Sequence, residues 1–172
     1  MESWLWRGML AAAIALPALC GVARAQSTDN DGCSNKTLKG DYAFAVTGWN
    51  LINQLWVPEF IVGITQFDGN GKFTQVDYPA DGALMTPPVT DFRTGQTGTY
   101  TVNADCTGNA ELDLNAGGTG TGHGVINLKF VISNGGRSAH AVVAKDISPF
   151  ATQPSIAVAR TDFWKVGSER ED

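Results

Sequence analysis

The chain has 172 residues, of which 43% are hydrophobic and 17% are charged, so it can bury one core and is too apolar to be disordered throughout. Its formal net charge is -5. Nucleic acids and anionic membranes attract proteins with clustered Lys and Arg, so the composition argues against both as partners.

The N-terminal part of the chain has the pattern of an export signal. Arg7 precedes an apolar stretch from Met9 to Leu19 that is too short to span a bilayer, and Ala23-Arg24-Ala25 supplies the small residues that signal peptidase accepts. Cleavage after Ala25 predicts an exported protein, periplasmic or secreted, without a membrane anchor. The predicted divisions are a signal peptide at 1–25, a polar leader at 26–35, one domain at 36–167 and a polar tail at 168–172.

Export also bears on the cysteines, because Cys20 would leave with the signal peptide. Cys33 and Cys106 then remain, and in an oxidising compartment the default for two cysteines is a disulfide. The bond would close a loop of about 74 residues, which corresponds to roughly 4 to 5 kcal/mol in the chain-entropy estimate. The alternative is a reactive thiol or a metal pair, but no further His or Cys lies near either position in the sequence.

The remaining chain has the pattern of an antiparallel meander. Apolar and β-branched runs recur between Gly, Asn and Asp, and Asp68-Gly69-Asn70-Gly71 and Asn134-Gly135-Gly136 are typical hairpin turns. Short links favour antiparallel neighbours, so about eight strands predict an all-β, up-and-down barrel, with a β-sandwich as the alternative. The predicted strands are 40–48, 60–67, 72–78, 97–103, 108–114, 124–133, 137–146 and 155–165.

The strand at 124–133 shows clear alternation. Ile126, Leu128 and Phe130 are predicted to face the core, while Asn127 and Lys129 face outward. Elsewhere both faces are partly apolar, as in residues 156–159. Such strands indicate either contacts between copies of the chain in a homo-oligomer or small residues near the surface.

Three pieces resemble a pattern that recurs in small exported bacterial proteins. They are C-S-N-x2-L-x-G-x-Y-x-F from Cys33 to Phe44, the hairpin from Phe67 to Phe73, and G-T-Y-T-V-N-A-D-C-T-G from Gly98 to Gly108. The layout is also similar to calycin-like and allene-oxide-cyclase-like (dirigent-like) barrels. The resemblance implies a small barrel with Cys33 bonded to Cys106, and it implies no chemistry.

Three ionisable residues are candidate catalytic groups. Glu59 lies between apolar residues, where a buried carboxylate would have a raised pKa and suit acid or base work; the alternative is a carboxylate at a strand start. His140 lies within a predicted strand and is either a structural histidine or a general base. Arg160 shares a face with Asp162, so the two form either an ion pair or an anion site.

Aromatic residues gather in the two longest predicted connections, 49–59 and 79–96. These residues suggest a lid over a ligand site, a plug for the barrel or a protein contact, and they are Trp49, Trp56, Phe60, Tyr78 and Phe92. The Gly-rich stretch 117–124 fits no phosphate-binding pattern, and His123 and His140 have no metal-ligand spacing, so no cofactor or metal is predicted.

Three functions remain open. The first is a binding module for a small apolar or aromatic molecule under the 49–59 and 79–96 connections. The second is an isomerase or cyclase that uses one acid or base in a barrel pocket. The third is a structural envelope or secreted protein whose barrel is filled by side chains.

Overall fold

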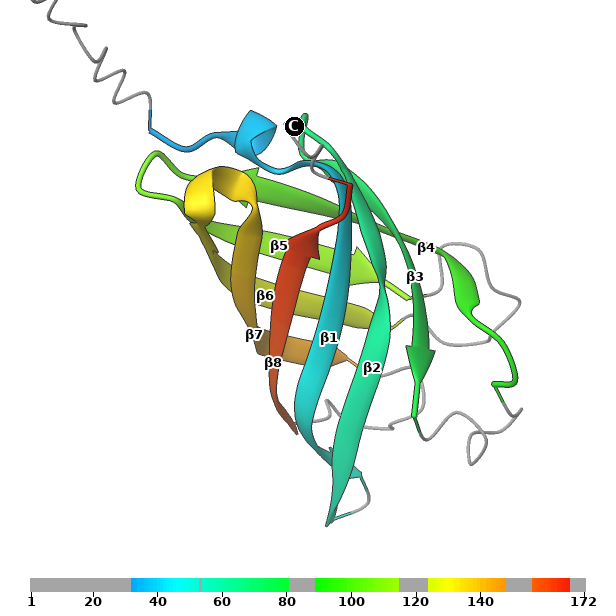
Figure 1. The fold of residues 1–172 in the computed structure, drawn as a ribbon. Helices are drawn as coiled ribbons and strands as arrows, with labels where there is room; N and C mark the ends of the chain where they lie inside the picture. The colour runs from blue at the N-terminus through cyan, green and yellow to red at the C-terminus, as the bar shows by residue number, and fades with distance from the viewer. Residues whose placement is uncertain (1–31, 53, 81–88, 115–123, 148–155, 168–172) are drawn as a thin grey trace, which may run out of the picture. The chain divides into compact units, whose positions relative to one another are not determined.

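The computed structural model describes residues 32–52, 54–80, 89–114, 124–147 and 156–167, whose strands all belong to one compact unit. The strands form a closed antiparallel barrel in chain order, with β1 pairing with β8 (Figure 1). A short 3-10 helix, η1 (Asn35–Thr37), precedes β1, and a second, η3 (Asn134–Gly136), joins β6 to β7. The strands are β1 (Lys39–Ile52), β2 (Leu55–Asp68), β3 (Lys72–Pro79), β4 (Arg93–Val102), β5 (Thr107–Asp113), β6 (Val125–Ser133), β7 (Ser138–Ile147) and β8 (Ile156–Lys165).

The predicted up-and-down barrel is confirmed, and the alternative of a sandwich is wrong because the β1–β8 pairing closes the sheet on itself. The prediction of a connection at 49–59 is also wrong. β1 and β2 continue as paired strands through most of this segment, with Leu51 opposite Trp56, and Gln54 turns the chain with a positive φ of 68°. This segment carries apolar side chains on both faces, so its sequence lacks the alternation of apolar and polar residues that predicts a strand.

Aromatic side chains fill the end of the barrel that holds the β2–β3, β4–β5 and β6–β7 turns. Phe67 lies at their centre, with its ring centroid 5.4 Å from that of Tyr42, 5.5 Å from that of Phe73 and 5.0 Å from that of Tyr100. Gly98 of β4 leaves room for the Phe73 ring of the paired strand, because a Cβ at position 98 would overlap that ring. This half of the barrel is therefore a packed core.

The predicted alternation of burial in β6 is observed at Lys129 and Phe130, whereas Asn127 is half-buried like its neighbours. Phe130 is buried and Lys129 is exposed, and the Lys129 ammonium contacts the amide oxygen of Asn109 on the outer face. Ile126 and Leu128 share the inner face with Phe130 but keep part of their accessible surface. On the inner face of β6, Phe130 is thus the fully buried side chain, and Ile132 beyond it is also half-buried.

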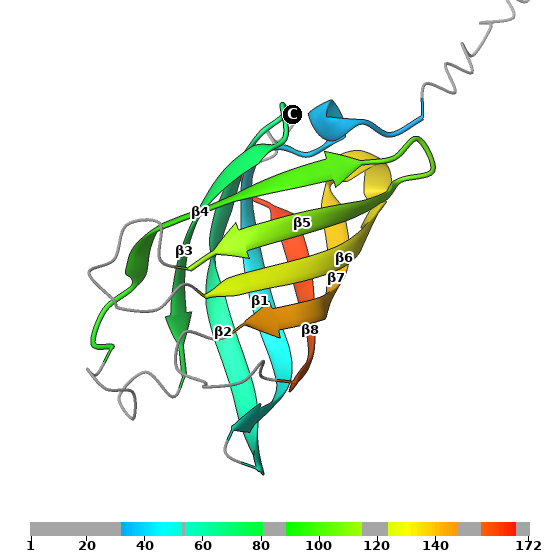
Figure 2. The same cartoon turned by 180° about the vertical axis from the view of Figure 1, so that it is seen from behind.

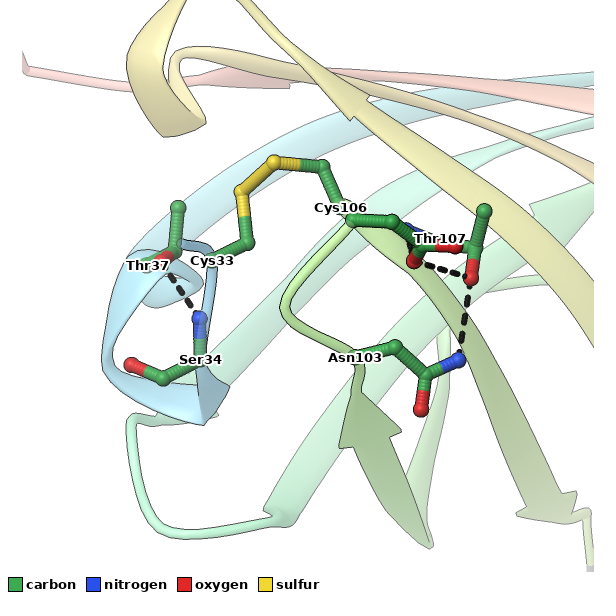
Figure 3. The surroundings of a disulfide bond; sticks show 7 residues. Cys33, Ser34, Thr37, Asn103, Cys106 and Thr107 are labelled. Atoms are coloured by element: carbon green, nitrogen blue, oxygen red, sulfur yellow. Dashed lines mark hydrogen bonds between the residues drawn. A yellow bond between two sulfur atoms is a disulfide. The ribbon is translucent and has the colours of Figure 1, made fainter. Parts of the chain in front are cut away.

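The predicted disulfide joins Cys33 and Cys106 with Cα atoms 4.9 Å apart, and it ties the segment before β1 to the turn between β4 and β5 (Figure 3). The backbone N–H of Cys33 donates to the Ala104 carbonyl at 3.1 Å. The Asn35 side-chain oxygen accepts the Val102 N–H at 2.8 Å. Together these bonds hold the N-terminal segment at the aromatic end of the barrel, which we call the disulfide end.

Carboxylates stabilise the tight turns at the disulfide end. Asp68 Oδ1 accepts the backbone N–H groups of Lys72 and Asn70 at 2.9 and 2.7 Å, and these bonds lower the pKa of Asp68, that to Lys72 most. The hydroxyl and N–H of Thr107 donate to Asp105 and lower its pKa in the same way. Both residues make the local backbone bonds that Asp commonly makes in turns.

Several predictions lie outside the described residues, namely the signal peptide, most of the polar leader, most of the glycine-rich stretch with His123, and the polar tail. In the part of the chain that is described, no helix is long and apolar enough to cross a membrane.

Candidate functional site

The predicted aromatic residues lie on the outside of the barrel wall. Trp49 projects from β1, and Trp56 and Phe60 project from β2, with exposed fractions of 51%, 51% and 54%. Tyr78 lies on the outer face of β3, and its ring centroid is 5.9 Å from that of the exposed Phe92. The structure therefore brings these residues together as an outer surface rather than over the barrel interior.

Two of the three candidate catalytic residues also lie outside. His140 on β7 and Arg160 on β8 flank Asp162, with His140 Nδ1 2.8 Å from one carboxylate oxygen and Arg160 Nε 3.7 Å from the other. His140 and Arg160 are both well exposed. The interpretation of Arg160 and Asp162 as a surface ion pair fits this geometry, and the cross-strand contact of His140 with Asp162 adds to it.

Glu59 lies on the other side of the wall. In β2, Glu59 lies on the same inward-pointing face as Ile61, Gly63 and Thr65. Its partner in β1 is Gly48. Its side chain is half-buried. Glu59 is therefore the residue among the predicted acid and base candidates that the fold directs to the barrel interior.

A buried polar cluster, absent from the sequence predictions, spans the inner faces of β2, β3 and β4. Arg93 makes a two-pronged ion pair with Asp77, both N–O distances being 2.7 Å. Gln96 donates its amide N–H to Asp77 at 2.8 Å and accepts one from Gln75 at 2.9 Å. Thr65 donates to Gln75 at 2.9 Å, so five side chains form one continuous chain of hydrogen bonds.

The Asp77 side chain is 3% exposed, whereas that of Arg93 is 24% exposed. Arg93 carries five N–H donors and uses two of them on Asp77, so its guanidinium has spare donors next to solvent. The ion pair thus has a buried anionic side and an accessible cationic side. This arrangement can hold a hydrogen-bond acceptor beside Arg93 without breaking the pair.

The inner face farther from the disulfide end is partly accessible. Val46, Ile61, Ile126 and Leu128 point inward yet are only half-buried. Asn50 shares the inner face of β1 with Val46, and its Oδ1 atom is buried with no hydrogen-bond partner among the described residues. Aliphatic surface and polar groups therefore occur together on this part of the inner wall.

Two hollows described on the barrel lie outside its wall. One, of about 720 Å³, extends over β1 to β5, and its lining includes Thr97 and Glu111 from the outer face and also Phe67 and Phe73. The other, of about 620 Å³, lies beside His140, Trp164 and Arg137. Both are wide open, unlike the concave sites that enclose most of a small ligand.

The described residues include no group of three or more His, Cys, Asp or Glu side chains that could hold a metal ion. Comparison with protein-family models, curated proteins and solved structures found no match for the chain. The functional interpretation therefore depends on the geometry of the barrel itself.

Proposed function

We propose that the protein binds a small, mostly apolar molecule inside the barrel, in the half remote from the disulfide. The observation that carries the proposal is the mixed inner wall there, where accessible aliphatic side chains lie near a buried polar cluster. Small-molecule sites are predominantly apolar with a few placed polar groups, and this wall has that composition. The ligand would lie against Leu128 and Ile61 and direct a polar group to Arg93 or Asn50.

The energetics of the polar cluster support the same proposal. A buried ion pair contributes little to stability compared with apolar side chains of similar volume, because both charges must leave water. The aromatic packing at the disulfide end shows that this sequence can fill its barrel with rings. A chain of five polar side chains in the adjoining part of the interior is therefore better explained by ligand recognition than by stability alone.

An isomerase- or cyclase-type activity is a second candidate, favoured by the inward position of Glu59. A carboxylate on a partly apolar wall can accept or donate a proton to a molecule bound beside it. This candidate requires the same interior site, so failure of the binding test would exclude it as well.

The test is to measure fluorescence of 1-anilinonaphthalene-8-sulfonate, an apolar aromatic sulfonate, on the purified protein and on two variants. Leu128→Trp adds a ring to the inner wall, and its neighbour Lys129→Trp adds the same ring to the outer face. We expect Leu128→Trp to lower the affinity for the probe at least tenfold and Lys129→Trp to leave it unchanged. If Leu128→Trp does not fold, Ile126→Phe supplies a milder obstruction of the same wall.

A third variant separates the interior from the apolar outer surface, to which the probe could also bind. Val62→Lys adds a charge to that surface and should leave interior binding intact. Equal probe binding in Leu128→Trp and the unmodified protein would overturn the proposal. Loss of probe binding in Val62→Lys but not in Leu128→Trp would also overturn the proposal. Native mass spectrometry would identify any co-purifying molecule.

A further inference from the structure

The outer face of β1, β2 and β8 carries a continuous set of exposed apolar side chains. These strands are neighbours in the barrel (Figure 1). Register places Trp49 between Pro58 of β2 and Val158 of β8, so the apolar side chains continue across strands. We call this set the apolar face, and its main members are Trp49, Trp56, Phe60, Val62, Ile64 and Val158.

The exposed area of the apolar face lies at the upper end of what a monomer commonly exposes. Each of its main members retains between 44% and 62% of its accessible surface. With aromatic side chains of 150–250 Å² each and somewhat smaller aliphatic ones, the six expose roughly 600 Å². A monomer's largest apolar patch is about 300–600 Å², and one side of a standard protein interface is about 800 Å². The six residues alone therefore supply most of one side of an interface.

On the rest of the outer wall, exposed apolar side chains such as Val131 on β6 and Val142 on β7 are interspersed with polar ones. The outer faces of β4, β5 and β6, on the side seen in Figure 2, carry exposed Thr97, Thr99, Glu111 and Lys129. A barrel embedded in lipid needs an apolar band on all its strands, and these strands do not provide one. This distribution favours a protein partner over a lipid environment.

We infer that the apolar face is where a second copy of this chain docks. A symmetric interface requires a surface that is complementary to itself, and an uncharged apolar face meets that requirement although the chain as a whole is acidic. The closed barrel has no free sheet edge, so copies associate by packing their strand faces together. Arg160 and Asp162 on β8 border the apolar face with both signs of charge, as in the polar rim of an interface.

The test is sedimentation equilibrium on the purified protein and on two matched valine variants. Val62→Lys adds a charge within the apolar face, and Val131→Lys adds the same charge on the outer face of β6. The two valines have nearly equal exposure, 53% and 49%, so neither change should unfold the barrel. We expect the unmodified protein and Val131→Lys to associate, and Val62→Lys to be at least tenfold weaker in association.

If Val62→Lys fails to fold by circular dichroism, Val158→Lys on β8 probes the same face from a more exposed position. A monomeric unmodified protein at high concentration would overturn the inference. Equal association of Val62→Lys and Val131→Lys would also overturn it. Flotation of a monomer with phosphatidylcholine vesicles, abolished by Val62→Lys, would assign the face to a lipid surface instead.

Discussion

Replacing Asp77 with alanine tests whether the buried polar cluster is an integrated part of the fold. The substitution removes the acceptor for three donor groups, namely Arg93 Nε, Arg93 Nη2 and the amide of Gln96. Removing one partner of a buried ion pair typically costs 3–5 kcal/mol, because the other charge stays buried without compensation. Arg93 is 24% exposed and can regain some hydration, so the expected loss is about 3 kcal/mol.

The reverse substitution should be at least as damaging. Arg93→Ala leaves the carboxylate of Asp77, which is 3% exposed, with Gln96 as its remaining side-chain donor. We expect about 4 kcal/mol for this variant, since water reaches Asp77 less easily than Arg93. Combining Asp77→Leu with Arg93→Met should recover most of the loss, because no charge then remains buried.

The assay is urea unfolding followed by circular dichroism, with the free energy of unfolding compared at constant m-value. Asp162→Ala is the matched control, because Asp162 also contacts an arginine and a second donor but does so on the outer face. It should cost less than about 1 kcal/mol. Equal losses for Asp77→Ala and Asp162→Ala would show that the inner cluster does not contribute to folding as the contacts imply.

Three further predictions address other parts of the barrel. Phe130→Ala should lower the free energy of unfolding by roughly 3 to 5 kcal/mol and Lys129→Ala by less than about 0.5 kcal/mol, and equal effects in urea unfolding would contradict the assigned register of β6. Cys106→Ala should cost roughly 2 to 5 kcal/mol in the same assay, and an unchanged midpoint would exclude a stabilising disulfide. Asp68 has a lowered pKa in the folded protein. Its contribution to the free energy of unfolding is therefore complete above the pKa of the unfolded chain, near about 4, and is lost as the pH falls through the lower pKa of the folded protein. Asp68→Asn should therefore reduce the loss of stability as the pH falls below about 4, measured by urea unfolding at each pH.

The sequence predicted the barrel well because its two strongest signals are local. Alternation in β6 and the Gly- and Asn-containing turns placed the strands, and two cysteines in a chain with the pattern of an export signal predicted the disulfide. Neither prediction required knowledge of which strands are neighbours. The pairing of β1 with β8 was predicted only from the general tendency of a meander of about eight strands to close into a barrel.

The interior cluster could not be predicted because it depends on register between separated segments. Asp77 meets Arg93 where the β3–β4 pairing shifts by a bulge after Gln75, and no pattern in either segment marks that shift. One signal was present, since Phe73, Gln75 and Asp77 alternate and must share a face. A polar residue repeated on the face of a buried phenylalanine indicates a polar interior.

In β2 and β3, the usual arrangement of apolar inner and polar outer side chains is partly reversed farther from the disulfide end. At the disulfide end, Phe67 and Phe73 point inward and Gln66 and Thr74 point outward, which is the arrangement that folding alone favours. Farther along the same two strands, Asp77 points inward while Phe60, Val62 and Tyr78 point outward.

A chain selected only for stability would not reverse its pattern within one sheet, and such local departures concentrate at functional sites. The reversal places polar groups where a bound molecule can use them and apolar groups where a second copy can cover them. The interior-binding and docking proposals therefore explain the two sides of one stretch of wall, and their variants, Leu128→Trp inside and Val62→Lys outside, should affect binding and association independently.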